Sequence, residues 1–132
     1  MVIDDSASML QRSGSTDLFD KAQNRIKTLV DQLDVSRQGD IFSLVTTSKP
    51  QEPWIWSQRI GDSFSRDIGV KLKELQATDR TTDLGKALNA TVQRAREVQD
   101  ASRTDYYLVG DRRSWDWATL DDKPRAALLS AL

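Results

Sequence analysis

The chain contains no cysteine and no histidine among its 132 residues. Without cysteine it can form no disulfide, no thiolate nucleophile and no thiolate metal site. Without histidine, a Ser-His-Asp triad and the usual zinc sites are excluded as well. No other side chain supplies a nucleophile with an adjacent base, so we expect a protein that is not an enzyme. Any metal or ligand chemistry in this chain must depend on oxygen atoms.

The chain also lacks an excess of charge of either sign and lacks long apolar runs. Its 19 basic and 20 acidic residues give a formal net charge of -1, which predicts no general attraction to nucleic acid or to anionic lipid. Its apolar runs fall far short of the ~20 residues that a membrane-spanning helix needs, so we expect no direct insertion of this segment into a bilayer. The length and the 38% hydrophobic content are typical of one globular domain, residues 1–132.

Runs rich in β-branched and aromatic residues alternate with apolar residues spaced three and four apart. This pattern predicts strands ending near Val2-Ile3 and covering 41–47 and 106–109, and helices over 17–33, 64–75, 84–98 and 123–132. Thr16 or Asp17 is expected to cap the first helix, and Thr82 or Asp83 the third. Residues 11–15 read as a loop, and Trp54-Ile55-Trp56 as a short edge strand or a cover for the sheet edge. The order predicts an α/β domain with a mostly parallel central sheet flanked by helices.

Hydroxyl and carboxylate side chains lie where three of these elements meet the loops. Asp4, Ser6 and Ser8 follow the first strand, Thr82 opens the third helix, and Asp111 follows the last strand. Right-handed crossovers bring the carboxyl ends of parallel strands to one edge of a sheet. Hard oxygen ligands of this kind suit Mg²⁺. Serine and aspartate are also ordinary turn formers, so the opening motif by itself has a second, purely structural interpretation.

Taken together, these motifs resemble the von Willebrand factor type A domain, whose metal-ion-dependent adhesion site is Asp-x-Ser-x-Ser, then Thr, then Asp. The resemblance implies a Rossmann-like three-layer fold and a site made of Asp4, Ser6, Ser8, Thr82 and Asp111. It implies that the two serines bind Mg²⁺, or else Mn²⁺ or Ca²⁺, directly. The threonine would join directly or through water, and the aspartates through bridging waters. One coordination position would remain for an Asp or Glu carboxylate of a protein partner, which makes the domain a metal-dependent adhesion module.

Several neighbours of the proposed ligands need a separate interpretation. Thr82 is preferred to Thr81 because it lies in Thr-x-x-Gly-x-Ala-Leu, the spacing that the family shows. Arg112 stands where the family often has glycine. Asp5 and Asp83 flank ligands and are candidates for groups that support them, but we expect exposed turn or helix-cap carboxylates at both positions.

A narrower similarity, carried by VIDDSASM, GDIFSLVTTS and DRRSWDW, is to bacterial BatA-like proteins with an N-terminal membrane anchor. Only three residues precede Asp4, fewer than a usual strand contains. The chain is therefore interpreted as a fragment of a longer protein that lacks terminal strands, in preference to a shortened domain with an exposed edge. Trp115 and Trp117 are expected to pack against the final helix, although they are also candidates for the rim of the metal site.

Three other functions remain as alternatives. A response-regulator receiver would use Asp4-Asp5 to bind Mg²⁺, but it also needs an Asp after the middle strand, where Thr46-Thr47-Ser48 stands. A phosphatase of the haloacid dehalogenase type needs Asp rather than Ser6 at the third position of its motif. The last alternative is a scaffold of the same fold without metal function.

Overall fold

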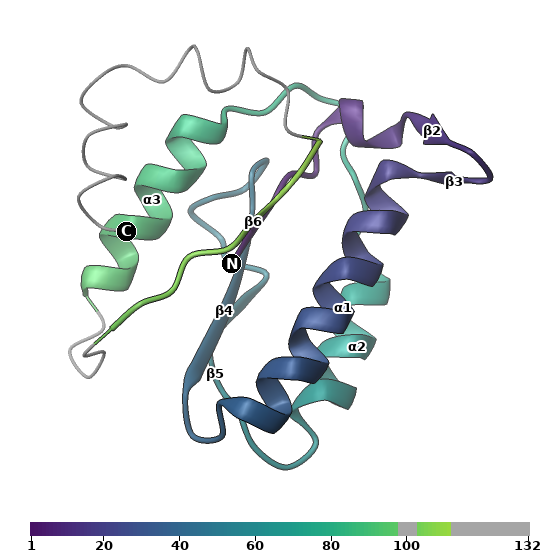
Figure 1. Cartoon of the computed structure of the whole chain (residues 1–132). Helices are drawn as coiled ribbons and strands as arrows, with labels where there is room; N and C mark the ends of the chain where they lie inside the picture. The colour runs from purple at the N-terminus through teal and green to yellow at the C-terminus, as the bar shows by residue number, and fades with distance from the viewer. Residues whose placement is uncertain (98–102, 112–132) are drawn as a thin grey trace.

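The described part of the structure, a computed structural model, covers residues 1–97 and 103–111 and is built around a four-stranded sheet (Figure 1). In chain order its elements are β1 (Val2–Ile3), the 3₁₀ helix η1 (Ala7–Leu10), β2 (Arg12–Ser13), β3 (Thr16–Asp17), α1 (Leu18–Ser36), β4 (Ile41–Thr46), β5 (Ile55–Arg59), α2 (Phe64–Glu74), α3 (Leu84–Arg96) and β6 (Leu108–Val109). The predicted helix 123–132, Trp115, Trp117 and Arg112 lie outside this range.

Strand β1 lies at the centre of the sheet, whose order is β5-β4-β1-β6. It pairs in parallel with β4, where Ile3 lies opposite Thr46, and with β6, where Ile3 lies opposite Val109. Strand β5 runs antiparallel to β4 at the edge. The predicted α/β class with a mostly parallel sheet is therefore confirmed.

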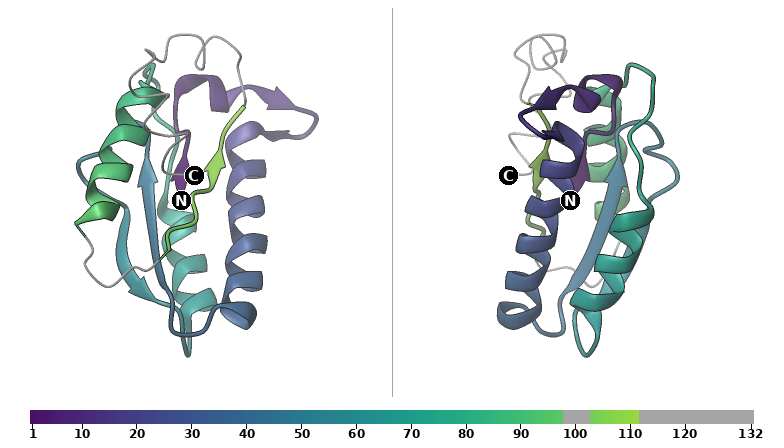
Figure 2. Two further views of the ribbon diagram at one scale, coloured as in Figure 1. Left: turned by 60° about the vertical axis from the view of Figure 1, so that its left-hand side comes forward. Right: turned by 90° about the vertical axis from the view of Figure 1, so that its right-hand side faces the viewer.

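Helices cover both faces of the sheet, with α1 and α2 on one side and α3 on the other (Figure 2). The two residues of β1 point to opposite faces, as alternate residues of a strand must. Ile3 packs in the larger core with α1 and α2, whereas Val2 packs with Ala87 and Leu88 of α3. This arrangement produces the three layers that the sequence predicted.

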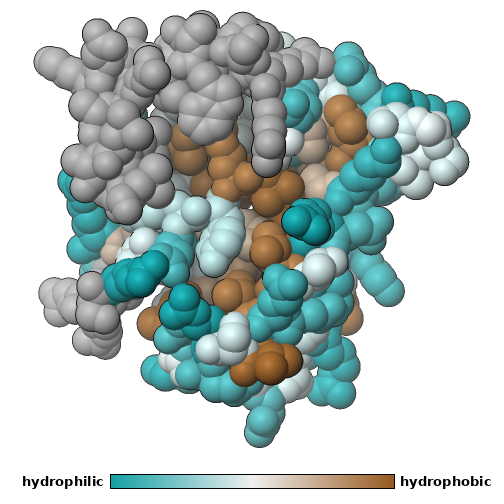
Figure 3. Space-filling view, viewed as in Figure 1, coloured by the Kyte–Doolittle hydropathy of each residue, from teal (hydrophilic) through white to brown (hydrophobic). Residues whose placement is uncertain are grey.

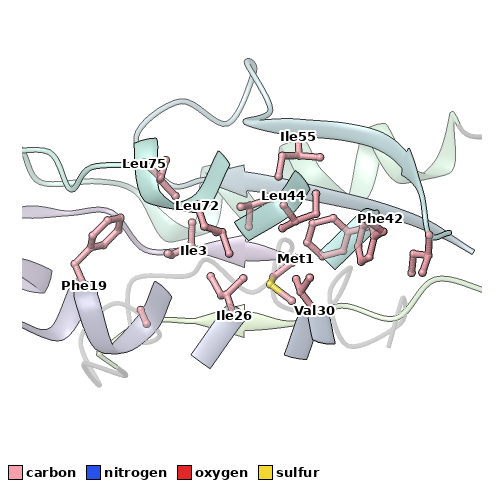
Figure 4. Close-up of a cluster of buried hydrophobic side chains, with 14 of the residues drawn as sticks. Met1, Ile3, Phe19, Ile26, Val30, Phe42, Leu44, Ile55, Leu72 and Leu75 are labelled. Carbon is pink, nitrogen blue, oxygen red and sulfur yellow. The ribbon is translucent and has the colours of Figure 1, made fainter. Parts of the chain in front are cut away.

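Helix α1 forms because an apolar stripe recurs along its length behind a suitable cap. Asp17 is the cap, since its Oδ1 accepts a hydrogen bond of 2.7 Å from the backbone N–H of Asp20. The stripe of Phe19, Ala22, Ile26 and Val30 is buried. Figure 4 shows Phe19, Ile26 and Val30 within the hydrophobic cluster beside the sheet. Hydrophilic residues of the same helix line the outer surface (Figure 3).

The edge of the sheet differs slightly from the prediction. Trp54 precedes β5 instead of belonging to it, and its indole N–H donates to the carbonyl of Lys71 at 3.1 Å. Trp56 lies in the strand, with the guanidinium of Arg94 5.3 Å from its ring centre. Trp54 thus contacts α2 and Trp56 contacts α3. Of the two predicted roles, an edge strand describes Trp56, and a cover for the sheet edge describes Trp54.

Several predicted bounds differ from the structure. Helix α1 continues to Ser36 instead of ending at Leu33, and β4 ends at Thr46 instead of Thr47. Residues 11–15 are not only a loop, because β2 and β3 form a small hairpin across Gly14, whose φ of 83° suits a tight turn. Helix α3 ends at Arg96, and β6 begins only at Leu108, after an extended approach. Short strands depend on pairing with neighbours, which local composition does not encode.

No helix in the described ranges is both long and apolar enough to cross a membrane.

Candidate metal centre

The segment that follows β1 lies between the carboxyl ends of its two neighbouring strands (Figure 1). The backbone N–H of Asp4 donates to the carbonyl of Val109 at 2.8 Å, and that of Thr47 donates to the carbonyl of Ile3 at 3.1 Å. These bonds continue the ladders of β1 with β6 and with β4. The first candidate ligand is thereby placed at the edge where parallel α/β sheets bind their ligands.

The opening motif forms a compact turn with its polar groups turned inward. Oδ1 of Asp4, a residue only 8% exposed, accepts a hydrogen bond of 2.9 Å from the backbone N–H of Ser6. The side-chain oxygens of Ser6 and Ser8 lie 2.9 Å apart. This distance suits a hydroxyl hydrogen bond. It also equals the separation of about 2.9 Å between adjacent ligands of an octahedral Mg²⁺ ion, given metal–oxygen bonds of about 2.0–2.1 Å.

Thr82 approaches Asp4 from the loop before α3. Its Oγ1 lies 3.5 Å from Oδ1 of Asp4, the long limit of a hydrogen bond, across 78 positions of sequence. Its neighbour Thr81 is exposed to solvent, whereas Thr82 is half-buried. Thr82 is thus the less exposed of the two threonines, and its hydroxyl lies within reach of the Asp4 carboxylate.

The loop before α3 is fastened directly to the opening turn. The backbone N–H of Thr78 donates to the carbonyl of Asp5 at 2.7 Å, and that of Ala7 donates to the carbonyl of Arg80 at 2.9 Å. Asp83 caps α3, since its Oδ1 accepts from the backbone N–H of Lys86 at 2.9 Å. The expectation of an exposed helix-cap carboxylate is therefore correct for Asp83.

Asp111 lies two residues beyond Val109, the partner of Ile3 in the β1–β6 register, and its side chain is half-buried. Gly110 brings the chain close to Asp4, because a Cβ atom at Gly110 would lie only 3.0 Å from Cβ of Asp4. The strand end that carries Asp111 therefore passes directly against the opening motif.

Asp5 corrects the expectation of an exposed turn carboxylate, because it is only 3% exposed. Its Oδ1 accepts hydrogen bonds from the hydroxyl of Thr47 at 2.9 Å and from the backbone N–H of Ser48 at 2.8 Å, and its Oδ2 accepts from the Ser48 hydroxyl. A buried carboxylate requires such donors. The physical reason for the correction is that β4 ends beside Asp5 and supplies them.

Thr47 and Ser48 are the residues near the site that the sequence interpretation did not single out. Both follow a predicted buried strand and both are short hydroxyl residues. That position at a strand end was the available signal, but only the β1–β4 register shows which side chains they meet.

The donor set fits a hard divalent cation. The five candidates offer hydroxyl and carboxylate oxygens, the ligand class that Mg²⁺ selects. Within residues 1–97 and 103–111, no group of three or more His, Cys, Asp and Glu side chains could hold a metal ion. A cation at this edge would therefore require the hydroxyls of Ser6, Ser8 and Thr82.

A family model for the von Willebrand factor type A domain matches residues 1–110. The matched range contains Asp4, Ser6, Ser8 and Thr82, and it ends one residue before Asp111. Searches of curated proteins and of solved structures gave no match.

Proposed function

Because the chain belongs to the von Willebrand factor type A domain family, whose members generally mediate protein–protein interaction, we propose that it binds a protein partner through a divalent cation. Mg²⁺ is the preferred ion, with Mn²⁺ and Ca²⁺ as alternatives. The proposed ligands are Asp4, Ser6, Ser8, Thr82 and Asp111. In this proposal the domain acts by adhesion and not by catalysis.

The observation that carries the proposal is the convergence of distant oxygen atoms. The 2.9 Å separation of the Ser6 and Ser8 oxygens and the 3.5 Å approach of Thr82 to Asp4 bring two loops to one point. Turn formation explains the first distance, and the backbone bonds of Thr78 and Ala7 explain why the loop before α3 lies nearby, but neither gives a reason for the Thr82 hydroxyl to face the Asp4 carboxylate. A common cation gives such a reason.

The chemistry of the ligands indicates what the partner supplies. Serine and threonine hydroxyls are neutral, so they leave the charge of the cation available to other groups. Mg²⁺ usually keeps several waters in its coordination shell, and an incoming oxygen can replace one of them. An Asp or Glu carboxylate is the natural replacement, because it adds the opposite charge. We therefore propose an acidic residue at the centre of the partner's interface.

The other functions have less support at this site. A receiver would need an Asp at the end of β4, where Thr46, Thr47 and Ser48 lie. A dehalogenase-type phosphatase would need a carboxylate in place of Ser6. A scaffold without metal function remains the competing outcome, and the experiment below distinguishes it. We also propose a membrane-anchored bacterial parent protein, on the basis of the short motifs that resemble BatA-like proteins.

The cation is tested by calorimetric titration of the chain with MgCl₂ and by thermal unfolding in Mg²⁺ and in EDTA. At a free Mg²⁺ concentration of 100 times the Kd, binding should stabilise the folded state by about 2.7 kcal/mol through linkage. Thr82→Val should lose most of this gain, whereas Thr81→Val is the matched control and should keep it. Identical unfolding of the unsubstituted chain in Mg²⁺ and in EDTA would establish the metal-free scaffold instead.

The partner carboxylate is tested once a binding protein has been identified by capture on the immobilised domain. Recovery should require Mg²⁺ and should fail with Ser6→Ala. In the purified partner, replacing the interfacial Asp by Asn, or Glu by Gln, should abolish binding while leaving the partner folded. Equal capture by the unsubstituted domain and Ser6→Ala, in Mg²⁺ or in EDTA, would contradict metal-bridged adhesion.

A further inference from the structure

Thr47 occupies a special position relative to the proposed cation site. It follows β4 directly, its side chain is buried with 3% exposure, and its backbone N–H continues the ladder to Ile3. That ladder fixes the separation between Thr47 and the Asp4–Asp5 turn. The pairing of β4 with β1 in the central sheet therefore places the hydroxyl of Thr47 beside the turn.

The hydroxyl contacts both carboxylates of the turn. Its oxygen lies 3.1 Å from Oδ1 of Asp4 and 2.9 Å from Oδ1 of Asp5, and it accepts from the backbone N–H of Asp5 at 3.2 Å. A hydroxyl has one proton, so it can donate to only one of the two carboxylates at a time. Asp5 has two other donors, both on Ser48. The Thr47 hydroxyl therefore links the two carboxylates, with its oxygen within hydrogen-bond distance of both.

Asp4 depends on few donors to hold its orientation. Apart from Thr47, its Oδ1 accepts from the backbone N–H of Ser6 at 2.9 Å and meets the Thr82 hydroxyl at 3.5 Å. The Thr82 hydroxyl is itself a proposed ligand, so a bound cation would change its contact with Asp4. The Thr47 hydroxyl is the only side-chain donor to Asp4 among the described residues that would remain unchanged.

We propose that Thr47 is a positioning residue for the cation site, holding the Asp4 carboxylate in place through its hydroxyl and tying it to Asp5 and the end of β4. This inference rests on the proposed function. Partners that orient metal ligands typically contribute about 10- to 100-fold to metal affinity. Thr47 would act in this way from a strand end, without touching the cation.

The test is calorimetric measurement of the Mg²⁺ Kd for the unsubstituted chain, Thr47→Val and Thr47→Ser. Valine keeps the shape and removes the hydroxyl, so we expect Mg²⁺ binding about 10- to 100-fold weaker. Serine restores the hydroxyl, and its Kd should return to within about 3-fold of the original. Thr46→Val is the matched control, because this buried neighbour places its hydroxyl near Ser48, at 3.5 Å, and its Kd should be unchanged.

Thermal unfolding in EDTA separates positioning from a merely structural role. If Thr47→Val lowers the melting temperature in EDTA but binds Mg²⁺ as tightly as the unsubstituted chain, Thr47 is structural and the inference is overturned. If valine prevents folding, the comparison passes to Thr47→Ala and Thr47→Ser, which differ by one oxygen atom. Equal Kd values for that pair would overturn the inference equally.

The same experiment keeps the two proposals apart. If the unsubstituted chain does not bind Mg²⁺, Mn²⁺ or Ca²⁺, the proposed function fails and the inference fails with it. If the unsubstituted chain binds and Thr47→Val binds equally well, only the role of Thr47 is disproved.

Discussion

Asp4 is surrounded by groups from several distant segments of the chain. Its carboxylate meets groups from the opening turn, from the end of β4 and from the loop before α3. Gly110 approaches from a fourth direction and leaves no room for a side chain. At the residue scale, the close approach to Asp4 therefore depends on glycine at position 110 as well as on the polar side chains.

Gly110→Ala should destabilise the fold by about 1–3 kcal/mol, as overpacking of a well-filled site does. The added Cβ would lie 3.0 Å from Cβ of Asp4, an atom that cannot swing away because it is bonded to the backbone. Urea denaturation measures the loss. Gly61→Ala is the control, since the nearest heavy atom to its Cβ, Oε1 of Gln38, is 4.0 Å away. Equal denaturation midpoints for the two variants would contradict this crowding.

At the scale of elements, helices α1 and α2 meet beside Gly69, a glycine within α2. The side chain of Lys27 from α1 crosses over it. The Lys27 ammonium then donates to the hydroxyl of Ser65 at 2.9 Å and pairs with Asp31.

Gly69→Ala should stabilise the protein by up to about 1 kcal/mol, because alanine removes the backbone-entropy cost of a glycine within a helix. The new Cβ would meet Cε of Lys27 at 3.1 Å, but this is the far end of a flexible, partly exposed side chain that can move. Thermal and urea unfolding measure the change.

The control for Gly69→Ala is the same substitution in a Lys27→Ala background, where the contact no longer exists and the gain should be at least as large. A clear loss of stability in the first background, with a gain in the second, would show that Lys27 is held too firmly to yield.

At the scale of the whole molecule, the proposed cation would connect segments that the chain separates. The opening turn, the loop before α3 and the end of β6 reach the same edge only because β1 lies between β4 and β6 (Figure 1). Cation binding there should therefore stabilise several separate segments of the chain at once.

Hydrogen exchange should show this coupling directly. In saturating Mg²⁺, amides of residues 4–10, 78–83 and 109–111 should exchange more slowly than in EDTA, because opening any of these segments would break the shared site. Amides near the carboxyl end of α2, at 70–74, lie in a different element and serve as the internal control. Protection confined to 4–10 would mean that the serine turn holds the ion without Thr82 or Asp111.

Much of this architecture could be predicted before any coordinates. The α1 stripe of Phe19, Ala22, Ile26 and Val30 and a cap at Thr16 or Asp17 are local patterns. The structure confirms the stripe and shows Asp17 as the cap. The Asp-x-Ser-x-Ser motif and the choice of Thr82 over Thr81 depended on spacing within short segments. Such features are governed by neighbours three or four residues away, so the chain expresses them without reference to the rest of the fold.

The surroundings of the site depend instead on register between strands. Asp5 is buried because Thr47 and Ser48, more than 40 residues away, lie beside it in the folded sheet. The same register places Gly110 against Asp4 and gives Thr47 its two carboxylate neighbours. A pattern of residue types predicts which elements form, but contacts between distant segments depend on how those elements align. For that reason the candidate ligands were proposed from the sequence, while the residues that contact them were identified only from the fold.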